Sequence, residues 1–344
     1  MHYNELTPYG GVIMALCMAL AAVSGVVLIP FFRFYKTGFF EAHIGDRLRK
    51  DDSSPRFGGV LMMGAVTAGV IGGVYVLSRV NTTFDRNDIK RLTAALVYAF
   101  FVFIAGFLQD YLKQKLRRPA GLKLPMLFLY LWAVSAAFLV SLRLISGMSG
   151  KVLLPFRLGF LGFGVLYYPV TGLVMAISCF AFMVHDTFGG EEEYCCDGLL
   201  GVTTVLMSLF FAAMTDYECS LLGYITAGSV AGLLVWSLFP SKIYFGESGQ
   251  LLCASLFCAM CILSKRELLL IILPVSVIID MLASLLRYVY YRLTKKVLLH
   301  GGSMHAHLKK KGINDISIIM LSLPFTLAGI AAAAAFYVYS LDIL

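Results

Sequence analysis

Apolar stretches about twenty residues long recur along the whole chain, and they constrain its fold more than any other feature. About ten of them can be distinguished, centred near residues 10–32, 57–78, 92–108, 124–146, 164–184, 197–214, 219–239, 249–263, 268–290 and 316–341. A membrane-spanning helix needs roughly 20 apolar residues, so this pattern predicts an all-α, polytopic membrane protein with about ten transmembrane helices. The close spacing leaves no room for a soluble domain, and residues 1–344 are expected to form a single integral membrane domain.

Composition and charge support the same class of protein. The chain is 59% hydrophobic and 14% charged, whereas a soluble domain carries about 25% charged residues. The first apolar stretch follows Glu5 rather than a basic segment, and its length predicts a retained helix instead of a cleaved signal peptide.

The net charge of +8 has a membrane explanation rather than a nucleic-acid one. With the N-terminus outside, lysine and arginine are about twice as frequent in the cytoplasmic loops as in the loops on the opposite side. The cytoplasmic clusters fall near residues 47–56, 113–123 and 292–311. Both termini are therefore expected outside, and no nucleic-acid partner is expected.

Three polar segments interrupt the apolar pattern on the side expected to be cytoplasmic. They read GFLQDYLK at residues 106–113, FGESG at 245–249 and SMHAHLKKKG at 303–312. A carboxylate at the mouth of a spanning helix needs water or a partner, so such an acid is a candidate functional group. Asp110 and Glu247 are the acids concerned.

These segments, together with two others, resemble in order the active-site loops of the polyprenyl-phosphate N-acetylhexosamine-1-phosphate transferases. The family's GFxDDYxK pattern is matched at Gly106, Phe107, Asp110, Tyr111 and Lys113; its DGLDG pattern at Asp197, Gly198, Leu199 and Gly201; its PAxxFMGDxGS pattern at Pro240, Gly246 and Gly249. A PRFGG element at residues 55–59 has a counterpart in the family as well. Within the superfamily, the MraY branch carries a PIHHHxELKG element, to which His305, His307, Lys311 and Gly312 are similar.

The resemblance implies an activity and a set of roles. A transferase of this kind moves phospho-N-acetylmuramoyl-pentapeptide, or a related phospho-sugar, from its UDP carrier to undecaprenyl phosphate, releasing UMP in peptidoglycan synthesis. Carried over by position, Asp110, Glu247 and Gln109 would be catalytic; Asp197, Lys113, His305, His307 and Lys311 would bind nucleotide or phosphate; Glu247 and Asp110, with Asp197 as a third candidate, would hold Mg²⁺. Membrane lipid and a second copy of the chain are the other partners implied, and the location is a bacterial inner membrane with the active site facing the cytoplasm.

Several positions depart from the family pattern, and they coincide with its reaction centre. Gln109 and Leu200 stand where the family has aspartates, Glu247 replaces a third aspartate, and Ala306 replaces the middle histidine. Glutamine keeps a hydrogen-bonding amide but cannot take up a proton, and magnesium is sensitive to the geometry of its carboxylate ligands. The run of three acids at residues 191–193 either restores charge or is a solvated surface.

Two alternatives to an active transferase follow. One is a catalytically degenerate paralogue that binds polyprenyl lipid or nucleotide sugar without transferring it. The other is a transporter or lipid scramblase, which requires internal repeats or broken helices that the sequence does not indicate.

Overall fold

The computed structural model describes residues 7–34, 55–80, 85–114, 121–148, 150–153, 159–186, 198–215, 217–238, 241–296 and 303–341. Its elements are α1 (Thr7–Phe34), α2 (Gly58–Val80), α3 (Arg86–Gln114), α4 (Leu124–Ser146), β1 (Lys151–Leu153), β2 (Phe160–Gly162), the 3-10 helix η1 (Gly164–Leu166), α5 (Tyr167–Asp186), α6 (Leu199–Met214), α7 (Tyr217–Ser237), α8 (Gly246–Leu263), α9 (Leu269–Ile272), α10 (Val275–Thr294), α11 (Met304–Lys310) and α12 (Asp315–Leu341). The predicted all-α, polytopic membrane fold is confirmed. The structure also contains a small antiparallel hairpin that was not predicted, in which Lys151 of β1 pairs with Gly162 of β2.

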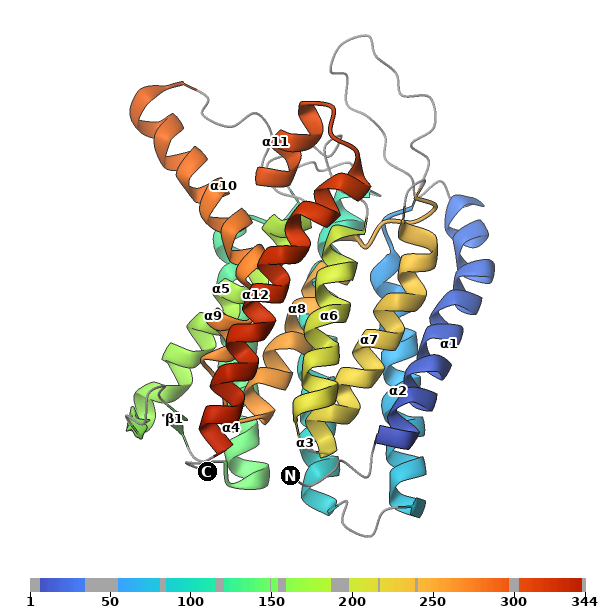
Figure 1. Cartoon of the computed structure of the whole chain (residues 1–344), viewed down its shortest axis with the longest axis vertical. Helices are drawn as coiled ribbons and strands as arrows, with labels where there is room; N and C mark the ends of the chain where they lie inside the picture. The colour runs from blue at the N-terminus through green and yellow to red at the C-terminus, as the bar shows by residue number, and fades with distance from the viewer. Residues whose placement is uncertain are drawn as a thin grey trace.

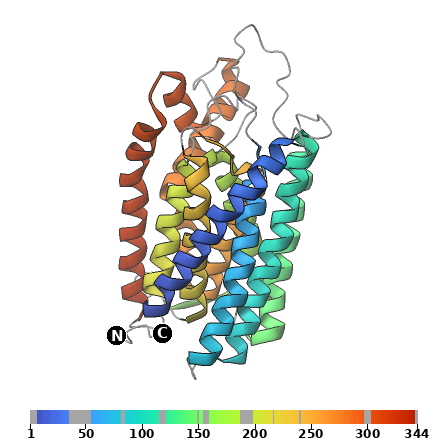
Figure 2. The ribbon, with the colours of Figure 1, turned by 90° about the vertical axis from the view of Figure 1, so that its right-hand side faces the viewer.

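The long helices run side by side along one axis and surround α8 (Figures 1 and 2). Every residue of α8 is buried, whereas fewer than a third of the residues in the apolar stretches of α1, α4 and α12 are buried. An exposed apolar surface of this kind is what a helix facing lipid requires. The central position of α8 matters for function, because it places Gly246 and Glu247 at the middle of one end of the bundle.

Eight helices of the described chain are long and apolar enough to cross a membrane. Helix α6 is apolar but shorter, with 16 residues. The expected span at residues 268–290 is not continuous: it is divided into α9 and α10 at Pro274, which lacks a backbone N–H to continue a helix. The prediction of one continuous span over these residues was therefore wrong.

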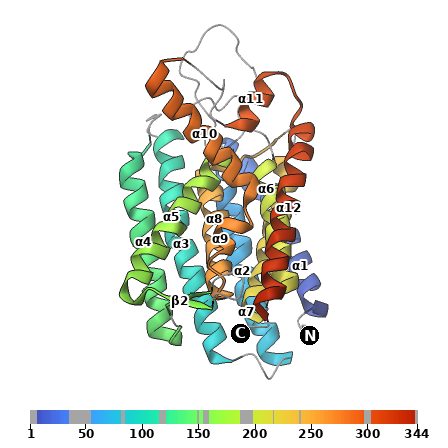
Figure 3. The same cartoon turned by 60° about the vertical axis from the view of Figure 1, so that its left-hand side comes forward.

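Both chain termini lie at one end of the bundle, and α11 lies at the other (Figures 1 and 3). Because successive long helices alternate in direction, the last turns of α3 and α5 and the first turns of α6 and α8 share the end occupied by α11. The polar segments singled out in the sequence therefore lie at the same end of the molecule wherever the structure describes them.

Candidate active site

Backbone hydrogen bonds join the segment before α2 to the segment before α8. The N–H groups of Gly58 and Gly59 donate to the carbonyl oxygens of Tyr244 and Phe245 over 3.0 and 3.2 Å, and Tyr244 N–H donates to Pro55 over 3.0 Å. This pairing holds the PRFGG element directly against the N-terminus of α8.

Two glycines allow α3 and α8 to approach closely. A Cβ added to Gly106 of α3 would lie 2.5 Å from the carbonyl oxygen of Glu247, a backbone atom that cannot easily move away. Gly246 has a φ of +67°, and a Cβ there would lie 2.0 Å from the carbonyl oxygen of Arg56. Glycine is required at both positions, for contact at the first and for contact and backbone conformation at the second.

Asp110 caps α8 from a neighbouring helix. Its Oδ1 accepts the N–H of Glu247 and its Oδ2 accepts the N–H of Ser248, each over 2.9 Å, and the residue is 3% exposed. The residue at the start of α8, Phe245, supplies no side-chain cap of its own. The expected span ended at residue 108, with residues 109–113 in the loop that follows. Residues 106–113 instead form the last two turns of α3, so Gly106, Asp110 and Lys113 share the helix face that meets α8.

Glu247 has one paired and one unpaired carboxylate oxygen among the residues that the structure describes. Its Oε1 forms an ion pair with the ammonium group of Lys113. Its Oε2 is buried and accepts no hydrogen bond from the residues that the structure describes. The Lys113 side chain is 22% exposed, and an ammonium group has three N–H donors, so it can pair with Glu247 and with a second anion together.

Gln109 precedes Asp110 in α3, and its side-chain amide oxygen accepts a hydrogen bond from the backbone. Oε1 accepts the N–H of Leu122 over 2.6 Å, and a Cβ on Gly121, which has a φ of +55°, would lie 2.0 Å from that oxygen. Gln109 therefore fixes the turn that leads into α4. Asp197 and residues 191–193 lie outside the described residues.

The predicted histidines occupy different environments. His305 is 4% exposed, with Nδ1 lying 3.2 Å from Asp280 Oδ2 and 2.9 Å from the Ser303 hydroxyl. His307 is partly buried, and Lys311, just after α11, is exposed. Two of the positions that depart from the family pattern are buried: Leu200, in the apolar core, is 1% exposed, and Ala306 is 5% exposed.

Sequence reasoning missed a second polar group at the same end. His185, the penultimate residue of α5, places Nδ1 2.7 Å from Oδ2 of Asp280, the same oxygen that His305 contacts. Asp280 is a lone acid in an apolar segment, and this signal, already applied to Asp110, could have identified it.

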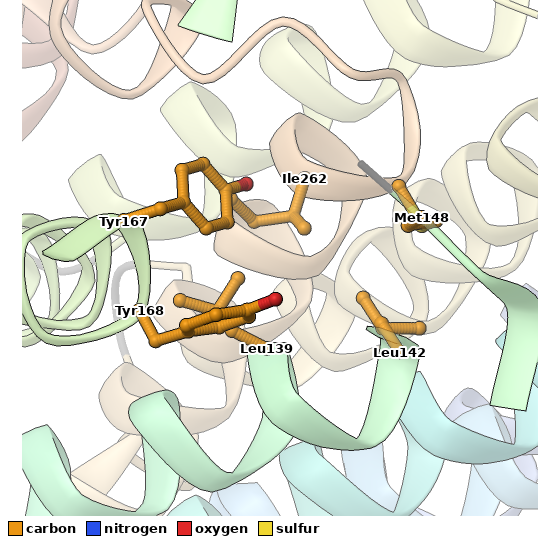
Figure 4. A pocket seen from close by; sticks show the side chains of 6 residues that line it. All are labelled: Leu139, Leu142, Met148, Tyr167, Tyr168 and Ile262. Atoms are coloured by element: carbon orange, nitrogen blue, oxygen red, sulfur yellow. The ribbon is translucent and has the colours of Figure 1, made fainter. Parts of the chain in front are cut away.

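An apolar pocket lies at the opposite end of the bundle, between the ends of α4 and α8 and the start of α5. It is lined by Leu139, Leu142, Met148, Tyr167, Tyr168 and Ile262, and its polar side-chain atoms are the two tyrosine hydroxyl oxygens (Figure 4). A pocket so lined offers no cation for a phosphate, so we place the candidate site around Asp110 and Glu247 instead.

Comparison with known proteins yields relatives of one kind. No protein-family model matches the chain. Phospho-N-acetylmuramoyl-pentapeptide-transferases from Symbiobacterium thermophilum, Clostridioides difficile and Caldicellulosiruptor bescii are 26%, 24% and 22% identical to it. These matches cover 93%, 92% and 88% of this chain and 94%, 95% and 89% of the respective relatives. The chain is therefore similar, distantly but over nearly its whole length, to the phospho-N-acetylmuramoyl-pentapeptide-transferases (MraY).

Proposed function

We propose that the chain transfers phospho-N-acetylmuramoyl-pentapeptide, or a closely related phospho-sugar, from its UDP carrier to undecaprenyl phosphate. Residues 1–344 would act as one membrane domain, with the end that carries α11 facing the cytoplasm of a bacterial cell. The observation that carries the proposal is the group formed by Asp110, Lys113 and Glu247, in which α3 fixes the start of α8 and one carboxylate oxygen has no partner among the described residues.

The reaction that fits this group is a displacement at phosphorus. An oxygen of the lipid phosphate forms a bond to the β-phosphorus of the UDP-linked donor, and the bond from that phosphorus to the oxygen of UMP breaks. The products are a lipid-linked pyrophosphate and UMP. Both substrates are anionic, so the site has to offset repulsion between phosphates, and fixed charges and dipoles are the main means of doing so.

The residues present supply such charges. Lys113 can donate to a phosphate oxygen while it remains paired with Glu247. The first turn of α8 adds the positive end of a helix dipole, although Asp110 already accepts its Glu247 and Ser248 amide hydrogens. Asp110 would therefore act through the position of Glu247, and Gln109 through the turn at Leu122.

The donor set fits a magnesium ion held mainly by substrate. Magnesium in such sites is commonly bound through one or two carboxylates, with phosphates and water completing its coordination. Glu247 Oε2 is a buried acceptor with no hydrogen-bond partner in the described part of the chain, and it would be the protein ligand there. When bound, the ion would neutralise charge on the pyrophosphate. Asp197 remains a further candidate ligand by its position in the sequence alone.

The test is UMP release by the detergent-purified protein. It is given UDP-N-acetylmuramoyl-pentapeptide, undecaprenyl phosphate and magnesium, beside one of the bacterial transferases as positive control. Omission of the lipid and addition of a chelator are the negative controls. Lipid-dependent UMP release establishes the reaction, and its loss with chelator establishes the metal requirement.

An inactive protein, beside an active control, would favour the degenerate binding paralogue or another donor sugar. The structure offers one argument for the degenerate paralogue. Gln109 and Leu200 stand where the family has acids, and both are buried; the Gln109 amide oxygen accepts the N–H of Leu122. Binding of the UDP-sugar measured by calorimetry separates the two: a paralogue that binds without transfer would bind it, whereas an enzyme for another donor would not.

A further inference from the structure

The polar group formed by His185, Asp280 and His305 joins three separate elements of the chain. His185 belongs to the end of α5, Asp280 to the second turn of α10, and His305 to the start of α11. Both imidazole Nδ1 atoms lie within hydrogen-bonding distance of one carboxylate oxygen, Asp280 Oδ2, at 2.7 and 3.2 Å.

This group is closed to solvent. His185 is 1% exposed, Asp280 is 6% exposed and His305 is 4% exposed. Ser303, which is also buried, lies 2.9 Å from His305 Nδ1 and caps α11 by accepting the N–H of Ala306. A phosphate group in solvent cannot reach His305 in this arrangement without displacing α11, so a direct phosphate contact is not the role that its position supports.

Helix α11 depends on such an anchor. It has seven residues, and a helix this short is not stable by itself in water. Its packing against α10 and α12 is small compared with that of the long helices. A buried carboxylate that loses its hydrogen-bond donors, or a buried imidazole that loses its acceptor, carries a large penalty, which makes the group a strong constraint on where α11 docks.

We infer that Asp280, with His185, is a positioning residue that fixes α11 through His305. It thereby fixes the place of His307 and Lys311, for which the resemblance implies a phosphate contact. His305, for which the resemblance implies the same contact, holds the helix instead. The anchoring step stands without the proposed function, whereas the phosphate contact of His307 and Lys311 rests on it.

The first experiment is amide hydrogen exchange on the full-length protein in detergent, without substrate. In Asp280→Ala, exchange across residues 303–311 should quicken by about tenfold or more, while residues of the buried helix α8 should change little. Asp280→Asn keeps one acceptor oxygen and should give a smaller increase in exchange rate. If the alanine variant does not fold, exchange in Asp280→Asn still tests the anchoring role. Lys311→Ala, which removes an exposed side chain just after the same helix, is the matched control, and its exchange should equal that of the unmodified protein.

The second experiment separates positioning from contact by kinetics. If α11 is docked only part of the time in Asp280→Ala, the KM for the UDP-sugar should rise about tenfold with kcat nearly unchanged, because saturating substrate restores the docked state. His307→Ala should instead lower kcat. Unchanged exchange at residues 303–311 in Asp280→Ala would overturn the anchoring role. A His305→Gln variant with reduced kcat and normal exchange would overturn the division between the two histidines. If the protein releases no UMP at all, the proposed function fails, and the exchange result still decides the anchoring role.

Discussion

Two buried glutamates at opposite ends of the bundle have carboxylates with different partners. Glu247 is 7% exposed and Glu267, between α8 and α9, is 8% exposed. In each, one oxygen is paired and Oε2 has no hydrogen-bond partner among the described residues. Glu247 is paired with the ammonium group of Lys113, whereas Glu267 accepts a hydrogen bond from the Tyr167 hydroxyl over 2.8 Å.

The difference lies in what each environment stabilises. Burial raises the pKa of Glu267, because its surroundings disfavour the charged carboxylate. Glu247 lies in the first turn of α8, and its Oε1 forms an ion pair with the Lys113 ammonium group. Burial of an acid is therefore not evidence of function by itself. The direct partner of the carboxylate separates the two, because Glu247 is ion-paired with Lys113 whereas Glu267 accepts a hydrogen bond from a tyrosine hydroxyl.

The largest expected effect is the loss of UMP release when Glu247 is replaced. Glu247→Gln should lower UMP release by about 100-fold or more, because the change weakens the proposed metal ligand and removes the ion pair with Lys113. Glu267→Gln is the matched control at the other end, and its turnover should stay within about threefold of the unmodified protein. The initial rate of UMP release is the measurement. Equal losses in the two variants would show that both act through stability, and would end the assignment of Glu247.

Asp110→Asn tests the connection between α3 and α8. An amide supplies only one acceptor oxygen for the two N–H groups that Asp110 now satisfies, and its NH₂ would face the other donor. We expect a loss of about 1–3 kcal/mol in the free energy of unfolding, together with a loss of activity of the same order as in Glu247→Gln. Glu247→Gln should keep more stability than Asp110→Asn, and thermal unfolding of the two variants makes that comparison. An Asp110→Asn protein with full turnover would remove Asp110 from the site.

Gly106→Ala tests whether the close approach of the helices is needed. The added methyl group would meet the carbonyl oxygen of Glu247 at 2.5 Å, so α8 has to shift. Overpacking of this kind costs about 1–3 kcal/mol, and displacement of Glu247 should reduce turnover by about tenfold. Gly64→Ala is the control, because Gly64 is exposed on α2 and a Cβ there meets nothing within 4 Å. If both variants behave alike in thermal unfolding and UMP release, the approach of α3 and α8 is not a constraint.

Much of this arrangement could be predicted because it depends on local sequence. Apolar stretches indicated the helices, and the order of short polar motifs indicated which segments meet. The interruption at Pro274 was missed because the residues on both sides remain apolar, and apolarity alone does not distinguish a continuous helix from two helices. The position of helix ends was also misjudged, so Asp110 was expected in a loop rather than as a cap on α8.

The site itself was predicted residue by residue but not in its connections. Nothing in the sequence around Gln109 shows that its amide oxygen accepts the N–H of Leu122, because that contact depends on how the chain turns after α3. The link from His185 to His305 through Asp280 joins residues 120 positions apart in the chain. Such contacts follow from tertiary packing, which single-sequence patterns do not contain.

The smallest expected effect concerns the pH dependence that Glu267 gives to stability. Its pKa in the folded protein is raised by burial above the ordinary value of 4.5, so the folded state binds more protons than the unfolded state between those two pKa values. Stability is therefore greatest at low pH in this window and falls as pH rises through it. Glutamine at this position cannot ionise but can still accept the Tyr167 hydroxyl hydrogen. The melting temperature of Glu267→Gln, relative to that of the unmodified protein, should thus increase as the pH rises above 4.5. A difference in melting temperature that stays constant as the pH rises would show that burial does not perturb the Glu267 carboxyl group.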